Sequence, residues 1–351
     1  MTDFLQLIYN WYNSNRRNLP WRNTEDPYKI WISEIILQQT RVDQGLEYYL
    51  KFIKAFPDVE SLASANENQV LKLWQGLGYY SRARNLHESA KVIKAKYNGI
   101  FPRSHTAILS LKGIGAYTAA AIASIAFGLP HPVLDGNVYR LLARYFGINS
   151  PADSSTGKKE FYKTACEIMP SNHPGFHNQA LMEFGALQCT PASPGCFNCP
   201  LVSSCFAFNQ KKVLQLPVKL KKTGKRSRYF CYYLIESKNS IWLEKRTAND
   251  IWKNLYQFPV IETTTELSEE FAATNPPHFL NGAEYQVKSV SAPQKHILTH
   301  QILFARLVHI ELTGPHPLTK NYLKIHKTDF PNYAVPRLIE KLAEKSKILK
   351  L

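Results

Sequence analysis

The sequence lacks any segment that a membrane or a secretion pathway would require. No apolar run among its 351 residues approaches the length of a bilayer span, because Lys, Asp or Gly interrupts the longest ones. The first residues, 1–12, have neither the basic start nor the apolar block of a secretory signal. We therefore expect a cytoplasmic protein with no membrane partner.

Acidic residues are scarce relative to basic ones. The chain has 27 Asp and Glu against 43 Lys and Arg, which gives a formal net charge of +16. Such a field attracts polyanions, so nucleic acid is the leading partner class. An anionic membrane surface is the second candidate, but no basic amphipathic helix supports it. A basic protein without a polyanionic partner is the plain alternative.

Cysteine is also scarce, yet four of the six cysteines crowd into seventeen residues. Cys166 and Cys231 stand alone and are expected to be small buried side chains. The others follow the spacing Cys-x6-Cys-x2-Cys-x5-Cys, at Cys189, Cys196, Cys199 and Cys205. In a cytoplasmic chain this clustering favours a metal over disulfides. The spacing leaves both zinc and an iron–sulfur cluster open, and the single Cys-x2-Cys hook favours the larger cluster.

The pattern of apolar residues changes near the middle of the chain, from helical to strand-like, which predicts two domains. Residues up to about 208 have helical periodicity, with N-cap and C-cap signals such as Asp26-Pro27 and Asn98-Gly99. Residues 211–228 contain eight basic residues and no acidic one, and we interpret them as an exposed linker that lies against phosphates or is merely solvated. Beyond residue 229 the segments 229–235, 241–243 and 302–310 resemble strands, and a last helix is expected from Pro336.

Two glycines mark a turn between helical segments, in Leu111-Lys112-Gly113-Ile114-Gly115-Ala116. Glycine allows a tight turn and a close approach of the backbone to a ligand. The amides at the start of the next helix are then free to bind a phosphate. Many such turns are plain connections, but in a basic helical domain we favour a helix–hairpin–helix that binds DNA phosphate at Gly113 and Gly115.

A pair of carboxylates carries the catalytic hypothesis. Glu34 stands inside an otherwise apolar helical segment, where a charge is costly without a partner or a wet cavity. Asp135 precedes a helix, and an N-cap role alone would explain it, just as a core salt bridge would explain Glu34. Cleavage of a glycosidic bond needs one acid with a raised pKa and one carboxylate that stays ionised. Glu34 suits the first role and Asp135 the second.

Together these motifs resemble the adenine DNA glycosylases of the MutY family. The resemblance is carried by the Ser-Glu-Ile-x-Leu-Gln-Gln-Thr segment, Gly-Leu-Gly-Tyr-Tyr-Ser-Arg at 76–82, the hairpin, Asp135-Gly136-Asn137-Val138 and the cysteine spacing. It implies a mostly α helix–hairpin–helix glycosylase domain over 1–210, the basic linker over 211–228, and an α+β Nudix-like domain over 229–351. It also implies a 4Fe-4S cluster on the four clustered cysteines.

The resemblance further implies a substrate and a set of residue roles. The substrate is double-stranded DNA in which adenine lies opposite 8-oxoguanine or guanine, bound by a monomer on the nucleoid. Glu34 would protonate adenine and later handle the water, and Asp135 would stabilise the oxocarbenium ion. The remaining site residues are Tyr117 and Asn137 around the catalytic pair, Trp21 and Arg22 lining the adenine pocket, and Gln39 and Tyr79 as wedges in the duplex. Core packing is the plain alternative for Trp21 and Tyr79.

The second domain would inspect the oxidised guanine. The family has Phe-Ser-His in a loop that touches the lesion, and the matching stretch here is Leu298-Thr299-His300. Thr299 keeps the hydroxyl and His300 is retained, whereas Leu298 replaces the aromatic ring. The plain alternative places both polar residues on a solvated strand face.

Three other functions compete with this interpretation. A glycosylase-lyase like endonuclease III would need a Schiff-base Lys after the hairpin, where this chain has Tyr117. A Nudix hydrolase would need an Arg-Glu-x-x-Glu-Glu box for magnesium, which residues 229–351 do not contain. A non-catalytic DNA-binding protein on the same scaffold would have no use for Glu34 and Asp135 together.

Overall fold

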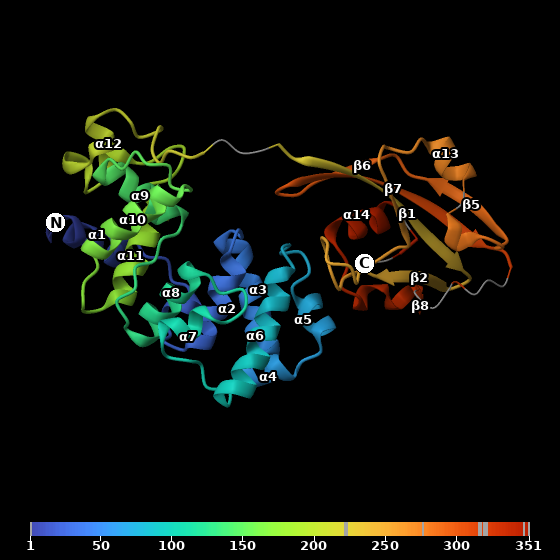
Figure 1. The fold of residues 1–351 in the computed structure, drawn as a ribbon, viewed down its shortest axis with the longest axis horizontal. Helices are drawn as coiled ribbons and strands as arrows, with labels where there is room; N and C mark the ends of the chain where they lie inside the picture. The colour runs from blue at the N-terminus through green and yellow to red at the C-terminus, as the bar shows by residue number, and fades with distance from the viewer. Residues whose placement is uncertain are drawn as a thin grey trace. The chain divides into compact units, whose positions relative to one another are not determined.

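The computed structural model describes residues 2–220, 224–275, 277–314, 318, 322–346 and 348–349. The chain forms two compact units (Figure 1). Each unit has its own hydrophobic core. Unit 1 comprises residues 1–64 and 85–222, and unit 2 comprises residues 65–84 and 223–351. Residues 65–84 thus pack with the C-terminal part of the chain, which no local sequence pattern predicts.

Unit 1 is helical, as its periodicity predicts. Its elements are α1 (Thr2–Asn15), η1 (Pro20–Arg22), α2 (Pro27–Leu37), α3 (Val42–Ala55), α4 (Val59–Ser64), most of α6 (Ser81–Tyr97), α7 (His105–Leu109), α8 (Ala116–Phe127), α9 (Gly136–Phe146), α10 (Ser155–Glu167), α11 (Pro174–Leu187), η2 (Cys196–Asn198), η3 (Val202–Ser204) and α12 (Phe206–Asn209). The expected cap at Asp26 is present, because its carboxylate accepts a hydrogen bond from the Tyr28 amide at 2.9 Å. Asn98 and Gly99 follow the end of α6 with left-handed φ values, as expected.

Helix α8 is the central element of unit 1. Its residues from Thr118 to Ser124 are all buried, and most of them are alanines. A helix that is apolar on every side belongs in a core, and small side chains let neighbouring helices approach closely. Helices α2 and α11 pack against α8. These three helices carry Glu34, Tyr117 and Glu183, so the core packing brings distant carboxylates into one region.

Unit 2 is built on an eight-stranded sheet. Its elements are α5 (Glu67–Leu73), β1 (Arg226–Ser237), β2 (Ser240–Lys245), β3 (Tyr256–Gln257), β4 (Val260–Thr263), α13 (Glu269–Thr274), η4 (His278–Leu280), β5 (Tyr285–Val290), β6 (Gln294–Ile297), β7 (Gln301–Leu312), β8 (Tyr322–His326), η5 (Lys327–Asn332) and α14 (Arg337–Ser346). The main strand order is β3-β2-β1-β7-β5, and β1 and β7 are parallel. The last helix begins one residue after the expected Pro336.

Both faces of the sheet are covered, which explains the continuous apolar run of β1. Phe230, Tyr232 and Leu234 join one core with α14, whereas Cys231 and Tyr233 join a second core on the other face. A strand buried on both faces has apolar residues at consecutive positions rather than alternate ones. The α+β second domain predicted from the sequence is therefore confirmed.

Arg228, the last residue of the expected linker, is not an exposed basic residue. It lies in β1 with 9% of its surface exposed, and its guanidinium pairs with Asp250 and Glu262 at 2.7 Å. A buried guanidinium requires such carboxylate partners, which leaves no free donor for a phosphate. Upstream, Leu216 is buried in the core of unit 1.

Candidate active site

Glu34 lies near the end of α2 and has only 7% of its surface exposed. Burial raises the pKa of its carboxyl to about 7, and the neighbouring charge of Asp135 acts in the same direction. The Tyr117 hydroxyl opposes this shift by donating a hydrogen bond to Glu34 Oε2 at 2.6 Å. Glu34 is therefore a carboxyl that carries a proton for part of the time near neutral pH.

Asp135 is the N-cap of α9, as its plain interpretation requires, but its position also places it beside Glu34. Its Oδ1 accepts hydrogen bonds from the amides of Asn137 and Val138 at 2.9 and 2.7 Å. The Asn137 side-chain amide donates to the second oxygen at 2.7 Å. Burial raises the pKa of Asp135 above its ordinary value, although these three hydrogen bonds and the charge of Arg140 act in the opposite direction. The donors all stabilise the anion.

One cavity of about 200 Å³ in unit 1 joins most of the residues predicted for the catalytic site. Its lining includes Trp21, Arg22, Glu34, Tyr117, Asp135 and Asn137. Trp21 also packs edge-on against Tyr49, with ring centroids 5.0 Å apart, so lining the cavity and packing in the core are compatible. Residues more than a hundred positions apart in the sequence thus share one small enclosure.

Sequence reasoning missed a charged cluster in the wall of the same cavity. Glu183 on α11 is 1% exposed and accepts hydrogen bonds from both Arg17 and Arg22. Burial alone would raise the pKa of Glu183, but the hydrogen bonds from Arg22 and Arg17 lower it to about 2. The available signal was the same as for Glu34, an acidic residue between the apolar Leu181 and Phe184.

The hairpin glycines lie between α7 and α8, and only one of them is required by the protein itself. Gly113 has φ +80°, and a Cβ there would lie 2.6 Å from the Cβ of Asn85. Gly115 is the N-cap of α8, with φ −95°, and no protein atom lies within 4 Å of a Cβ built there. The fold therefore explains the glycine at 113 and leaves the one at 115 unexplained.

The four clustered cysteines lie in the segment that follows α11, which contains the short helices η2 and η3. Cys189 interacts electrostatically with the other three thiols, those of Cys196, Cys199 and Cys205. All four cysteines are partly buried. The Arg144 guanidinium donates to Cys189 Sγ at 3.4 Å and to the Thr190 carbonyl at 2.8 Å. No three His, Cys, Asp or Glu side chains in the described ranges are arranged to hold a single metal ion.

Helix α9 connects this loop to the catalytic pair through hydrogen bonds. Arg140 Nη2 donates to Asn137 Oδ1 at 2.8 Å, and Arg140 Nε donates to the Cys189 carbonyl at 2.7 Å. Arg144 follows one turn later on the same face, since residues i and i+4 are neighbours on a helix. Asp135 caps the N-terminal end of α9, and Arg140 and Arg144 on the next two turns bind the cysteine loop.

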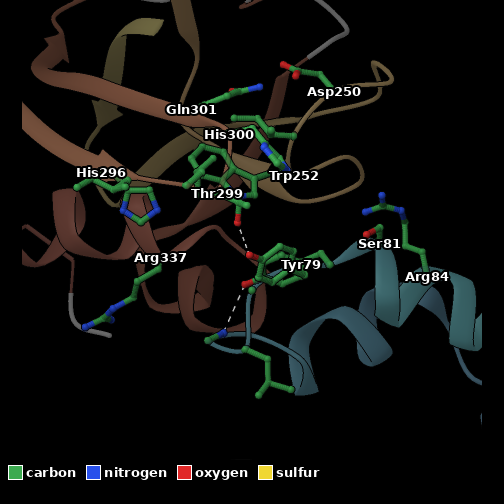
Figure 2. Close-up of a pocket in the computed structure, with 17 residues that line it drawn as sticks. Tyr79, Ser81, Arg84, Asp250, Trp252, His296, Thr299, His300, Gln301 and Arg337 are labelled. Atoms are coloured by element: carbon green, nitrogen blue, oxygen red, sulfur yellow. Dashed lines mark hydrogen bonds between the residues drawn. The ribbon is translucent and has the colours of Figure 1, made fainter. Parts of the chain in front are cut away.

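The expected lesion contacts lie in unit 2, around a pocket of about 500 Å³ (Figure 2). Thr299 and His300 are exposed in the turn between β6 and β7, rather than on a strand face. The Tyr79 hydroxyl and Thr299 Oγ1 form a hydrogen bond, and Trp252 and His296 line the same pocket. Leu298, which replaces the family's aromatic residue, packs against the core of α14 and the sheet.

The two expected wedge residues share an unusual backbone conformation. Gln39 has φ +58° and Tyr79 has φ +47°, and both side chains are exposed. Left-handed conformations are rare for residues other than glycine and cluster at functional sites. Gln39 belongs to unit 1 and does not line the cavity of Glu34, whereas Tyr79 belongs to unit 2.

The chain has the fold of DNA glycosylases of the helix–hairpin–helix class. Residues 32–165 match the HhH-GPD superfamily of base excision DNA repair proteins, and residues 231–345 match the NUDIX domain. A thermostable thymine-DNA glycosylase is a structural neighbour with TM-score 0.55 and 33% identity, covering 59% of this chain and 95% of that one. A trapped endonuclease III–DNA intermediate shares the fold, with TM-score 0.52, 22% identity, and coverage of 59% and 94%.

Within this class the sequence points to one family. The adenine DNA glycosylase of Buchnera aphidicola subsp. Baizongia pistaciae is 44% identical over 259 residues, which are 73% of each chain. The chain therefore belongs to the adenine DNA glycosylase family, as its motifs predicted. Among the described residues, no helix is long and apolar enough to cross a membrane.

Proposed function

We propose that this protein removes adenine from double-stranded DNA where adenine lies opposite 8-oxoguanine or guanine. The observation that carries the proposal is the pair Glu34 and Asp135 in one cavity, where Glu34 accepts a single hydrogen bond from a neutral hydroxyl and Asp135 accepts three. A cavity of about 200 Å³ is too small for a base pair, so the adenine would enter it by flipping out of the duplex.

Glu34 would act as the general acid. Its pKa of about 7 keeps a substantial protonated fraction at neutral pH, and transfer of this proton to the adenine ring turns the base into a better leaving group. Once the bond between base and sugar has broken, the ionised Glu34 is placed to accept a proton from the attacking water. Tyr117, which hydrogen-bonds Glu34, would orient the carboxyl.

Asp135 would stabilise the sugar cation that forms as the bond breaks. The three hydrogen bonds from Asn137 and Val138 favour its ionised form and fix its orientation. A preorganised anion next to a developing positive charge is worth most inside an enclosed cavity. In this proposal Asn137 positions Asp135 and does not itself contact the reacting bond.

Arg22 and Trp21 would line the space that the adenine enters. Glu183 already accepts five hydrogen bonds from Arg17 and Arg22, so its carboxylate would orient the Arg22 guanidinium rather than bond the base. Trp21 offers an aromatic surface for the base. Because Arg22 and Glu183 already hold each other, this recognition surface is formed before the base arrives.

We propose that the four clustered cysteines hold a 4Fe-4S cluster. The donor set fits, because four thiols in one loop are the usual ligands of such clusters, and Arg144 supplies a compensating positive charge. When bound, the cluster would fix the loop of residues 189–205 and take no part in base release.

The proposed division of labour assigns catalysis to residues 1–210 and lesion reading to residues 229–351, joined by the basic segment 211–228. Thr299 and His300 would contact the oxidised guanine, while Gln39 and Tyr79 would separate the bases where adenine leaves. Gly113 and Gly115 would bind phosphate. We further propose that the protein acts as a monomer on nucleoid DNA in the cytoplasm.

A product assay tests this function against the lyase alternative. Duplex DNA with a single adenine opposite 8-oxoguanine should release free adenine, and the strand should break only after alkali treatment. Borohydride should not trap the protein on the DNA, because Tyr117 stands where the lyase needs a Schiff-base lysine. Strand cleavage without alkali, together with trapping at one lysine, would favour the lyase.

A further inference from the structure

Asn178 is a buried residue whose side-chain amide forms hydrogen bonds with the segment that precedes Asp135 in the sequence. It lies on α11 with 1% of its surface exposed. Its Nδ2 donates to the His131 carbonyl at 2.9 Å and to Ser124 Oγ at 2.8 Å, and its Oδ1 accepts from the Val133 amide at 3.0 Å. Three separate parts of unit 1 therefore meet at one side chain.

The segment held in this way has no regular secondary structure of its own. Residues 128–135 connect α8 to α9, and Asp135 is the last of them. The ring of His131 also stacks on His105, with centroids 4.0 Å apart and planes inclined by 16°. Since an irregular segment lacks the hydrogen bonds of a helix or sheet, outside contacts must determine where it runs.

We propose that Asn178 is a positioning residue that sets the location of Asp135 in the active site. Val133, whose amide is held by Asn178, lies only two residues before Asp135. A shift of this amide moves the carboxylate relative to the cavity, and small misplacements of a catalytic group are costly in rate. This inference rests on the catalytic role proposed above for Asp135.

The substitution Asn178→Asp tests the proposal with almost no change in shape. The variant keeps an acceptor for the Val133 amide but replaces both donors by a carboxylate oxygen that faces the His131 carbonyl. The matched control is Tyr9→Phe, because the Tyr9 hydroxyl bonds the buried His177 on the same helix at 2.8 Å rather than a residue of the segment 128–135. Asp135→Asn serves as the reference for loss of the carboxylate.

Two quantities separate positioning from folding: the single-turnover rate of adenine release, and the Kd for a duplex carrying a non-cleavable adenine analogue. We expect Asn178→Asp to slow release by about tenfold to a hundredfold while the Kd stays unchanged. Tyr9→Phe should leave both at the wild-type level. A smaller variant, Asn178→Ser, should also slow release, which covers the case in which Asn178→Asp does not fold.

Wild-type release rates in every Asn178 variant that folds would overturn the inference. Equal losses of rate and affinity, in proportion to the unfolded fraction, would also overturn it, because they indicate a merely structural role. The proposed function is judged separately: if wild type releases adenine and Asp135→Asn does not, that function stands whatever Asn178 does.

Discussion

Glu34 and Glu183 are both buried carboxyl groups in the same cavity, yet their surroundings shift the pKa values of the two groups in opposite directions. Glu34 receives one hydrogen bond from a neutral hydroxyl and has a pKa of about 7. Glu183 is held by two guanidinium groups and has a pKa of about 2. Of these two carboxyls only Glu34 can therefore supply a proton near neutral pH, whereas Glu183 stays ionised in its ion pairs with Arg17 and Arg22.

Glu34→Gln should abolish base release without loss of DNA binding. The amide has nearly the same shape but cannot transfer the proton, so the single-turnover rate should fall by about 10²- to 10⁴-fold. Binding of a duplex with a non-cleavable analogue should remain at the wild-type level. A variant that releases adenine at a near-normal rate would remove Glu34 from the mechanism.

The rate of base release should depend on pH through Glu34. The raised pKa means that the carboxyl is protonated below about pH 7 and loses its proton as the pH rises above that value. The single-turnover rate should therefore decline above about pH 7, approaching a tenfold loss per pH unit. A rate that rises with pH between 6 and 9 would contradict the assignment of Glu34 as the acid.

How far these residues could be predicted from sequence depended on local context. Glu34 and Asp135 were recognisable because a charge in an apolar helix and an acid before a helix both call for a physical reason. Glu183 gave the same signal but was missed, because its partners Arg17 and Arg22 lie more than 160 positions away. Pairing across that distance depends on how α11 packs, which no local pattern reveals.

Among the elements, the helix–hairpin–helix turn offers a direct contrast between its two glycines. Gly113→Ala places a Cβ at φ +80° and 2.6 Å from Asn85 Cβ, so it should lower the free energy of unfolding by about 1 kcal/mol or more. Gly115→Ala meets no protein atom and should leave stability unchanged, but it should weaken DNA binding by obstructing a phosphate. Thermal unfolding and duplex Kd values measured on both variants test this contrast.

The cysteine loop gives a second prediction at this scale. Purified protein should be yellow-brown and contain four iron atoms per chain if a 4Fe-4S cluster is bound. Cys199→Ser should reduce the iron content and destabilise the loop, whereas Cys166→Ser, which changes a cysteine outside the cluster, should leave iron unchanged. Stoichiometric zinc without iron would contradict the cluster.

Elements with strong local signals were predictable and edge elements were not. The cap at Asp26 and the turn at Asn98-Gly99 both appear at the expected places. The apolar strands β1 and β7 were also indicated. In contrast, β5 has the burial pattern of an edge strand with several exposed polar residues, and its pairing with β7 depends on tertiary contacts rather than on its own sequence.

For the whole molecule, the division into units changes how lesion reading should be tested. Residues 65–84 pack with the C-terminal part of the chain, for example through Arg84, which donates to the Lys253 carbonyl at 2.8 Å. Deletion of residues 229–351 would expose the surfaces that this segment buries. Point variants in the pocket of unit 2 therefore give a cleaner test than truncation.

Thr299→Ala combined with His300→Ala should shrink the preference for 8-oxoguanine over guanine opposite the adenine. Two lost hydrogen bonds at about 1 kcal/mol each correspond to a reduction of up to about thirtyfold in this preference. The matched control is Thr274→Ala with His278→Ala, because these exposed residues of unit 2 lie outside the pocket. An unchanged preference in the first pair would show that these side chains do not read the lesion.

Adenine is a normal base, so an enzyme that recognised adenine alone would attack undamaged DNA. The proposed function is tested most directly by the single-turnover rate of adenine release from three duplexes that differ only in the opposite base: 8-oxoguanine, guanine or thymine. If the protein reads the opposite base as proposed, release is fastest opposite 8-oxoguanine, slower opposite guanine, and absent opposite thymine. Equal rates on all three duplexes, or no adenine release from any of them, would contradict the proposed function.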